Sequence, residues 1–342
     1  MHRLAVGTEK GGYLLEKNGD WSVVGPSFPG WKVTAYGRAS DGTHLAAIAS
    51  NWFGASVHRS PNFREWEQVE AGPSYPEHTR RQFNQVWTFT NAGDRVYAGV
   101  DEAGLFYSDD HGLSWSPVGA LNDHPTRGEW QPGFGGLCAH RVLVTGDRIV
   151  VGISAVGVFR SDDGGMQFDR FDAGVTPTIT TEADGSGRNG WCVHGLATDP
   201  ANPDRIWRQD HRGVYRTTDG GESWQKIEEG LPSNFGFAIG RDHESSTLFL
   251  VPLQSDENRL PRDGDLAAYR STDNGDTWEK SGTGWPEAPQ FTGVLRNAIS
   301  LDQQGGVAFG TTGGRVFVSV DRGDNWQELP FAFPRILSVA WL

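Results

Sequence analysis

The chain has 342 residues, with 46 glycines, 14 tryptophans and 18 phenylalanines against two cysteines and two methionines. A hydrophobic fraction of 37% with this many aromatic side chains is enough to bury a large core, which excludes intrinsic disorder. The net charge of −13 argues against sequence-independent binding of nucleic acid, because that binding needs basic side chains to neutralise phosphates.

The N-terminal segment Met1–Gly12 lacks the basic and apolar regions of a secretory signal. No apolar run along the chain approaches the roughly 20 residues that a transmembrane helix needs. Two cysteines cannot form a disulfide framework, which suits a reducing compartment. We therefore expect a cytoplasmic protein with neither a membrane nor a nucleic-acid partner.

Five segments share the pattern Ser/Thr-x-Asp-x-Gly-x-x-Trp/Phe without gaps, and their starts are 53, 56, 54 and 48 residues apart. In chain order they are Ser108–Trp115, Ser161–Phe168, Thr217–Trp224, Ser271–Trp278 and Ser319–Trp326. Ser60–Trp66 is a degenerate copy, and Lys17–Trp21 is one that has decayed further. The chain therefore contains seven repeat units.

Each clean copy follows a short alternating run, such as Gly157–Arg160 or Gly213–Arg216, and precedes another strand-like stretch. Asp and Gly between two such runs indicate a hairpin turn. The aromatic residue can then fill the gap between neighbouring sheets. A period near 50 residues with about four strands is typical of a β-propeller. The sequence therefore predicts an all-β fold, a seven-bladed β-propeller of four-stranded antiparallel blades.

The two ends of the chain complement each other. Pro334–Leu342 has the pattern of an isolated inner strand, whereas Leu4–Gly7, Gly12–Glu16 and Trp21–Val24 form three strand-like runs with no inner strand before them. One blade made from both ends removes an open sheet edge. We therefore expect the C-terminal strand to close the ring on the N-terminal strands. No linker divides the chain, so a single propeller domain over residues 1–342 is expected.

These motifs carry a family resemblance that runs over essentially the whole chain. The sequence resembles the Asp-box (BNR-repeat) propellers of the sialidase-like superfamily. The resemblance implies the propeller fold and implies that the Asp box is a structural turn, remote from the active face. It does not imply one function, because sialidases, sortilin-type receptors, xyloglucan-active glycosidases and a photosystem assembly factor share the motif.

In a propeller, the loops that enter the inner strands and those that join the second and third strands lie on one face, opposite the Asp boxes. We call this the loop face. Its loops are long here and rich in His, Trp, Arg and carboxylates, and binding residues concentrate on loops held by a rigid scaffold. Arginine pairs with carboxylates, and indole rings stack on sugars. The expected ligand-binding residues are Trp52, Arg81, Trp87, His124, Arg127, Trp130, Gln209, Arg259 and Arg296.

Two Cys-x-His sequences, Cys138–His140 and Cys192–His194, occur at matching register at the start of adjacent inner strands. Residues two apart on a strand point to one side, so each cysteine should project with its histidine. Another histidine follows on a loop of the second of these blades. Histidines with carboxylates nearby can perform acid–base chemistry. The predicted catalytic residues are His140, His194, His211, Glu129 and Asp210.

Other interpretations of these side chains stay open. The three histidines could ligate a divalent metal, or they could fill the channel and bond backbone carbonyls. A disulfide between Cys138 and Cys192 would need their Cα atoms about 5.5–6 Å apart, which adjacent inner strands need not provide. No metal ligand and no cofactor is assigned from the sequence.

The resemblance also invites a comparison with sialidases, which carry an Arg-Ile-Pro type motif near the N-terminus and a Tyr nucleophile with a Glu partner. The nearest fragment, Pro334–Ile336, lies at the wrong end of the chain. Tyr75 is the only tyrosine in a loop-face segment, with Glu77 beside it. True exo-sialidase activity is therefore not expected.

Three functions remain. The first is a glycoside hydrolase-like enzyme that binds a sugar or a polar anionic small molecule in a funnel at the channel mouth on the loop face. The second is a non-catalytic propeller that binds a protein, as the assembly factor and receptor relatives do. The third is a metal-dependent hydrolase or lyase that uses the histidine cluster. The sequence favours the first, because an enzyme needs convergent titratable groups, and it leaves the oligomeric state open.

Overall fold

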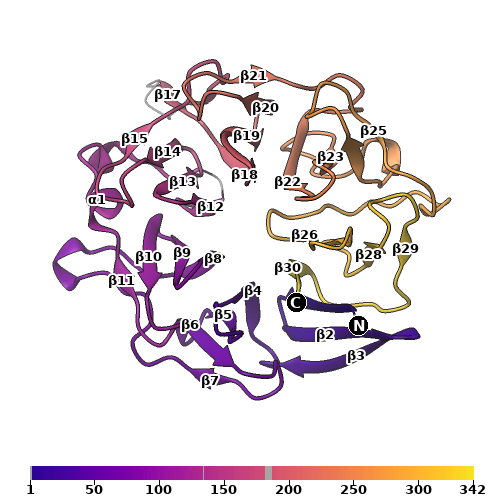
Figure 1. Ribbon diagram of the computed structural model, residues 1–342, viewed down its shortest axis with the longest axis horizontal. Helices are drawn as coiled ribbons and strands as arrows, with labels where there is room; N and C mark the ends of the chain where they lie inside the picture. The colour runs from indigo at the N-terminus through magenta and orange to yellow at the C-terminus, as the bar shows by residue number, and fades with distance from the viewer. Residues whose placement is uncertain (1, 134, 182–186) are drawn as a thin grey trace.

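The computed structural model describes residues 2–133, 135–181 and 187–342. Within these residues, seven four-stranded sheets form a ring around a central channel (Figure 1). Every pairing between neighbouring strands of a blade is antiparallel, for example Leu4 with Leu15 and Val151 with Phe159. The predicted seven-bladed β-propeller is confirmed.

The four layers of the ring are each built from seven strands. The innermost strands are β4 (Lys32–Arg38), β8 (Gln85–Ala92), β12 (Ala139–Thr145), β18 (Val193–Asp199), β22 (Phe235–Arg241), β26 (Ile299–Leu301) and β30 (Ile336–Trp341). The second strands are β1 (His2–Thr8), β5 (His44–Ser50), β9 (Arg95–Asp101), β13 (Arg148–Ile153), β19 (Asn202–Asp210), β23 (Leu248–Leu253) and β27 (Val307–Gly310).

The outer half of each blade holds its Asp box. The third strands are β2 (Gly11–Asn18), β6 (Gly54–Ser60), β10 (Gly104–Ser108), β14 (Gly157–Ser161), β20 (Gly213–Thr217), β24 (Tyr269–Ser271) and β28 (Val316–Ser319). The outermost strands are β3 (Asp20–Ser27), β7 (Glu67–Gln68), β11 (Ser116–Pro117), β15 (Asp169–Arg170), β21 (Gln225–Lys226), β25 (Glu279–Lys280) and β29 (Gln327–Glu328).

We number the blades 1 to 7 from the N-terminus, so that blade 1 contains both chain ends. Strand β1 pairs with β2 on one side and with the C-terminal strand β30 on the other. In that second pairing, Leu4 lies opposite Trp341 and Val6 lies opposite Val339. The predicted closure is therefore confirmed, and blade 1 has no free inner edge.

The Asp boxes are turns stabilised by side-chain bonds, as blade 5 illustrates. The Thr217 hydroxyl donates to Asp219 Oδ1 at 2.6 Å, and Asp219 accepts the Ser223 amide at 3.0 Å. Trp224 is buried and its Nε1 donates to the Phe171 carbonyl of blade 4 at 3.0 Å. The box therefore ties its own blade to the preceding one, which is the gap-filling role expected of the aromatic residue.

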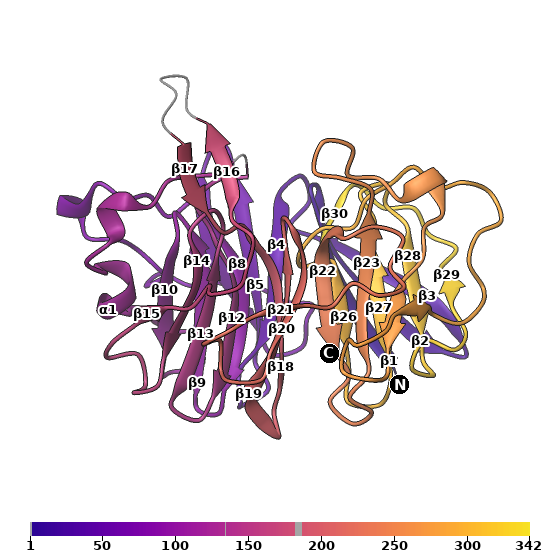
Figure 2. The same ribbon diagram turned by 90° about the horizontal axis from the view of Figure 1, so that it is seen from above.

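The remaining elements decorate the loop face. They are η1 (Glu77–Thr79), α1 (Gly119–Asn122), η2 (Arg127–Glu129), η3 (Arg262–Gly264) and the hairpin β16–β17 (Thr178–Thr181 and Gly187–Gly190). The hairpin leads into β18 and projects from this face (Figure 2). None of the helices in the described ranges is long and apolar enough to cross a membrane.

Candidate functional site

The inner strands are interrupted by β-bulges near their loop-face ends. The pairing register shifts around Thr34 in β4, Trp87 in β8, His140 in β12 and His194 in β18. A bulge breaks the strict alternation of a strand and re-aims the residue that it contains. Four successive blades therefore turn one side chain each out of the normal pattern at the same level of the channel.

Three of these bulged side chains bond to the backbone of the next blade. Thr34 Oγ1 donates to a β8 carbonyl at 2.8 Å. His140 Nδ1 lies 3.2 Å from the Val193 carbonyl, and His194 Nδ1 lies 2.7 Å from the Gly236 carbonyl. A carbonyl oxygen only accepts, so each imidazole carries its proton on Nδ1 and leaves Nε2 with a free lone pair. The two histidines thus help to close the ring, whatever else they do.

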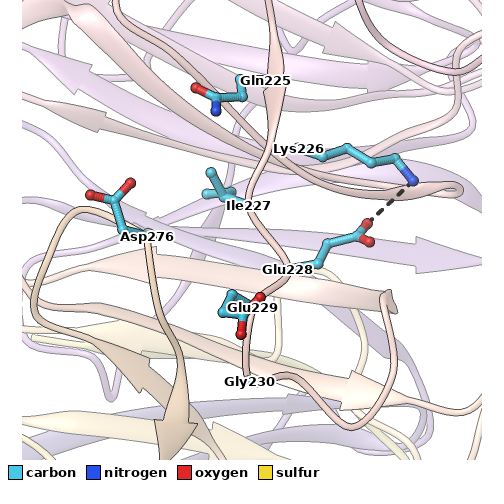
Figure 3. A pocket seen from close by; sticks show the side chains of 7 residues that line it. All are labelled: Gln225, Lys226, Ile227, Glu228, Glu229, Gly230 and Asp276. Carbon is cyan, nitrogen blue, oxygen red and sulfur yellow. Dashed lines mark ion pairs between the residues drawn. The ribbon is translucent and has the colours of Figure 1, made fainter.

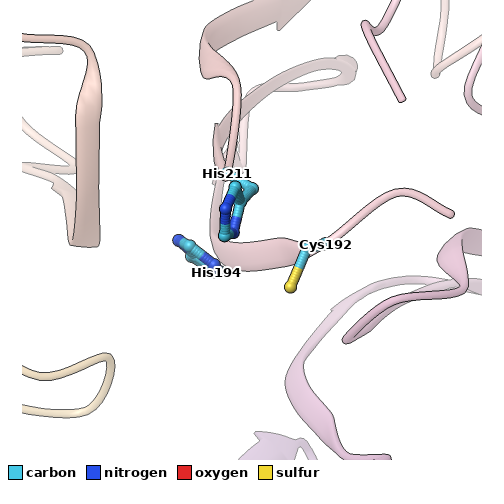
Figure 4. Close-up of side chains that lie close together, drawn as sticks. All are labelled: Cys192, His194 and His211. Atoms are coloured by element: carbon cyan, nitrogen blue, oxygen red, sulfur yellow. The ribbon is translucent and has the colours of Figure 1, made fainter. Parts of the chain in front are cut away.

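His194 also belongs to a compact cluster with Cys192 and His211 (Figure 4). One ligand atom from each residue lies within 4.8 Å of the others. The rings of His194 and His211 are 5.5 Å apart between centroids, in an edge-on arrangement. On its other side, His211 Nε2 lies 2.7 Å from Asp256 Oδ2. Loops of blades 5 and 6 therefore bring a thiol, two imidazoles and a carboxylate together.

Arg296 enters this region from the loop before β26. Its guanidinium lies over the Phe237 ring at 4.5 Å and over the Trp87 ring at 5.9 Å. Burial lowers the pKa of Arg296, and the nearby Cys192 and Cys138 thiols act in the opposite sense. Among the described residues, Arg296 forms no ion pair with a carboxylate. A cation without a fixed counter-ion among the described residues therefore lies near both thiols.

The Cys138 side of the site holds a second carboxylate. Cys138 Sγ donates to Asp101 Oδ2 at 3.4 Å, and Asn84 Nδ2 donates to Asp101 Oδ1 at 3.0 Å. Burial raises the pKa of Asp101 despite these two hydrogen bonds. The pKa of Asp256 is instead lowered. Burial acts to raise it, but the hydrogen bond from His211 outweighs burial. Two loop-face carboxylates, one bonded by Cys138 and one by His211, thus have pKa values shifted in opposite directions.

The two channel histidines are neutral at ordinary pH. Burial lowers the pKa of His140 and of His194, and the charge of Arg296 adds to both shifts. His140 Nε2 is buried without a hydrogen-bond partner, and the Trp87 ring meets the His140 ring edge-on at 4.6 Å between centroids. His140 therefore acts chiefly as a ring tie and wall.

The two Cys-x-His pairs differ from the expectation and from each other. Cys192 and His194 converge in the cluster, as the spacing predicts. Cys138 instead bonds Asp101 of the preceding blade, whereas His140 bonds Val193 of the following blade. A bulge at the histidine does not distinguish the two pairs, because β12 and β18 both have one there. The pairs differ in the partner of the cysteine, since Cys138 is bonded to Asp101 of blade 3.

Two predicted site residues lie beneath the site. Asp210 is fully buried, and its Oδ2 accepts a hydrogen bond from Arg208 Nε at 2.8 Å. Arg208 also pairs with Asp172 at 2.5 Å. Gln209 is buried as well, and its amide donates to three backbone carbonyls, including Asn234 O at 3.1 Å. These buried side chains support the loop of His211 from below.

Several other predicted residues form a separate wall over blades 3 and 4. Arg127 lies over the Trp130 ring at 4.6 Å and pairs with Glu102 at 3.5 Å. His124 lies beside the same indole, with its ring centroid 6.1 Å away. Glu129, at the end of η2, is exposed and forms no ion pair with another described residue. This wall reaches the site only through Glu102, the neighbour of Asp101.

Arg81 is held in the same wall. It pairs with Asp123, donates to the Asn122 carbonyl and lies over the Tyr75 ring at 5.1 Å. The Tyr75 hydroxyl donates to the Glu102 carbonyl at 2.5 Å, and burial raises the pKa of Tyr75. A buried phenol already used as a donor is poorly suited to be a sialidase-type nucleophile.

The most exposed aromatic side chains of the loop face lie in blade 2. Trp52 is 90% exposed and Phe53 is 78% exposed, in the turn between β5 and β6. The Phe53 ring stacks on Trp31 at 5.5 Å between centroids. Across the face, Arg259 is exposed and donates to the Asp256 carbonyl at 2.8 Å. These residues leave apolar and cationic surface open beside the channel mouth.

Two cavities lie away from this site. A hollow of about 460 Å³ runs along the outer strand β21, lined by residues 225–230 and Asp276 (Figure 3). It contains the ion pair of Lys226 and Glu228 at 3.5 Å. Another cavity, of about 370 Å³, lies at the far mouth of the channel, between the C-terminal halves of β8, β12, β18, β22 and β26. Neither of them includes the cysteines, Asp101 or Asp256.

Sequence reasoning missed the most informative contacts of the site. It placed Arg296 and both cysteines on the loop face but did not connect the thiols to a carboxylate or to the arginine. It did not single out Asp256 among the carboxylates of the loop face. The usable signal was its place on the loop between β23 and β24, which lies beside the β19–β20 turn that carries His211.

Comparison with known proteins defines the class. A family model for the BNR/Asp-box repeat matches residues 106–117, 215–226 and 269–280. Two solved structures share the fold. One, titled YCF48 bound to D1 peptide, is 14% identical, with a TM-score of 0.56 over 90% of this chain and 89% of that one. The other, AFV00434, an ancestral GH74 enzyme, is 15% identical, with a TM-score of 0.50 over 89% and 37%. The chain is an Asp-box β-propeller.

Two curated proteins are similar to this chain in sequence over part of its length. The chain is 27% identical over 187 residues to a probable oligoxyloglucan-reducing end-specific xyloglucanase of Neosartorya fischeri, which covers 53% of this chain and 20% of the relative. It is 26% identical over 172 residues to a xyloglucanase of a Paenibacillus species, covering 40% and 16%. The chain thus matches a fifth or less of these relatives' length. The similarity is thus to part of two xyloglucanases.

Proposed function

We propose that this protein is a glycoside hydrolase-like enzyme that binds a sugar, or another polar anionic small molecule, at the channel mouth of the loop face. The observation that carries the proposal is a pair of loop-face carboxyl groups, one bonded by Cys138 and one by His211. Asp101 and Asp256 have pKa values shifted in opposite directions by their surroundings. Such a divergence is how one site provides an acid and a base at the same pH.

In this proposal, Asp101 holds the proton. Its half-buried carboxyl group keeps a proton to higher pH than an exposed one, which suits donation to the leaving oxygen of a glycosidic bond. Asp256 stays ionised because His211 bonds it, so it is available as a base or nucleophile. His211 positions this carboxylate.

Substrate binding falls to the cations and aromatic rings around these groups. Arg296, without a carboxylate partner among the described residues, can pair with a uronate or another anionic group. Trp52 and Phe53 offer exposed rings for sugar stacking. The similarity to xyloglucanases makes xyloglucan oligosaccharides the first substrate class to test.

The test is hydrolysis of a panel of neutral and uronate-containing oligosaccharides, xyloglucan fragments included, followed by the release of reducing ends. Replacing Asp101 with Asn should lower kcat by about 10²–10⁴-fold, the usual contribution of general acid catalysis, with little change in ligand affinity. Glu129→Gln is the matched control, since Glu129 lies on the same face outside the carboxylate pair. Full activity of Asp101→Asn, or no binding of any glycan, would overturn the proposal.

A second candidate is a non-catalytic propeller that binds a protein segment. The exposure of Trp52 and Phe53 favours it, because large apolar side chains are rarely left this open without a partner. The solved relative titled YCF48 bound to D1 peptide provides a precedent within the fold. Pull-down with Trp52→Ala and Asp101→Asn separates the two functions. A protein binder loses its partner only with Trp52→Ala, whereas the enzyme loses turnover with Asp101→Asn.

A further inference from the structure

The cluster of Cys192, His194 and His211 has the composition of a transition-metal site. Thiolate sulfur and imidazole nitrogen are the preferred zinc ligands, and three protein ligands leave a fourth tetrahedral position for water. The three ligand atoms lie within 4.8 Å of one another, against about 3.3–3.6 Å around a tetrahedral zinc ion. Cys192 and His211 are only half-buried, so a side-chain shift of about an ångström closes the difference.

The orientation of the two imidazoles is a second and independent observation. His194 uses Nδ1 to bond the Gly236 carbonyl at 2.7 Å, which leaves Nε2 free to bind a metal. His211 uses Nε2 to bond Asp256 at 2.7 Å, which leaves Nδ1. Histidines that ligate metals almost always donate their other N–H to a carbonyl or a carboxylate, because this bond fixes the tautomer and the ring orientation. Both histidines of the cluster meet this condition.

We propose that Cys192, His194 and His211 form a zinc-binding centre, with Asp256 as the outer carboxylate that orients His211. A thiolate and the Asp256 carboxylate balance the two positive charges of Zn²⁺. Arg296 lies near Cys192, and its positive charge opposes the ion. The proposal goes beyond the glycosidase function, since the centre can bind zinc whether or not a glycan binds.

Cys138 and His140 provide the contrast within the same channel mouth. Cys138 bonds Asp101, and His140 points its only free nitrogen into a buried position without a partner. Neither belongs to the group whose ligand atoms converge. Cys138 is therefore the matched control: it has the same chemistry and lies in the adjacent blade, outside the cluster.

The experiment measures zinc in the full chain, purified without a histidine tag, stripped with chelator and reloaded with Zn²⁺. After desalting, we expect a near-stoichiometric zinc content by mass spectrometry in the wild type and in Cys138→Ser. Cys192→Ser should lose the ion, and Asp256→Asn should bind it about 10–100-fold more weakly. Wild-type protein without zinc, or equal zinc in Cys192→Ser and Cys138→Ser, would overturn the proposal.

Loading the wild type with Co²⁺ covers the case in which Cys192→Ser does not fold. A thiolate-to-cobalt charge-transfer band should appear at one ion per chain and disappear when Zn²⁺ is added. Its absence in folded protein excludes the cysteine ligand and the centre with it. Because no glycan enters either measurement, failure of the zinc centre and failure of the proposed hydrolysis are distinguishable.

Discussion

Two sectors of the ring use the same device with different side chains. In the hydroxyl sector of blades 1 and 2, Ser338 and Thr34 donate to the inner strand of the next blade, at 3.4 and 2.8 Å. In the histidine sector of blades 4 and 5, His140 and His194 make the equivalent bonds. A hydroxyl group is sufficient for ring closure, and an imidazole adds a second nitrogen. Closure of the ring does not require the second imidazole nitrogen. This difference therefore favours the histidine sector as the place of a functional site.

The largest expected effect tests the hydroxyl sector. Deleting residues 336–342 removes the inner strand β30, the Ser338 bond to blade 2 and the pairing with β1. Two sheet edges then open to solvent, so we expect aggregation or a large fall in melting temperature. Thermal unfolding of the purified truncation, followed by circular dichroism, checks this. A soluble chain that melts with the wild type would contradict the closure by blade 1.

The next largest effect tests the buried ion pairs that lie beneath the histidine sector. Arg208 is fully buried and pairs with Asp172 and Asp210 at 2.5 Å each. Arg208→Leu leaves two buried carboxylates without a counter-ion, which should cost about 3–5 kcal/mol of unfolding free energy in urea titrations. Arg95→Leu is the matched control, because it breaks an exposed pair with Asp109 that contributes about 0–1 kcal/mol. Equal losses in the two variants would show that the buried network does not support the site.

The fold and the site were predictable to different extents. The Asp boxes and the closing strand could be predicted because each depends on a local pattern, such as the Asp-x-Gly turn before Trp224. The convergence of Cys192 with His194 followed from strand spacing. The divergence of Cys138 from His140 did not follow, because Cys138 is bonded to Asp101 of the preceding blade and His140 to Val193 of the following one.

The buried position of Asp210 was also beyond the sequence. It ends β19, and only the packing of blade 5 shows that its carboxylate turns inward to Arg208. Contacts between blades were hidden in the same way. His211 bonds Asp256, which lies 45 residues further along the chain. Arg296, in the loop before blade 7, lies near Cys138 of blade 4 and Cys192 of blade 5. Such contacts depend on ring geometry, which no local pattern encodes.

A third prediction compares the two sectors directly. At the bulged position of β4, a threonine reaches the carbonyl of the next blade, so His140→Thr should keep the tie. We expect the free energy of unfolding of this variant to lie within about 1 kcal/mol of the wild-type value. His140→Val lacks the donor and leaves the Val193 carbonyl unpaired, which should cost about 1–3 kcal/mol. Urea midpoints decide the outcome, and equal stability of the two variants would mean that the His140 bond is not a tie.

The smallest effect is a pH dependence confined to the histidine sector. Burial lowers the pKa of His140 and of His194, whereas a histidine in the unfolded chain titrates near 6.5. Below that pH the unfolded state takes up protons that the folded state does not, so these groups stabilise the fold fully above pH 6.5 and lose this contribution as the pH falls. Each contributes a slope of up to about 1.4 kcal/mol per pH unit. His140→Thr should therefore reduce the slope of unfolding free energy between pH 6.5 and 5 by one histidine's share. Thr34→Val should leave the slope unchanged while lowering the stability itself, since no titrating group is lost from the hydroxyl sector. A wild-type slope in His140→Thr would mean that the pKa of His140 is the same in the folded and the unfolded chain, contrary to the lowering expected from its burial.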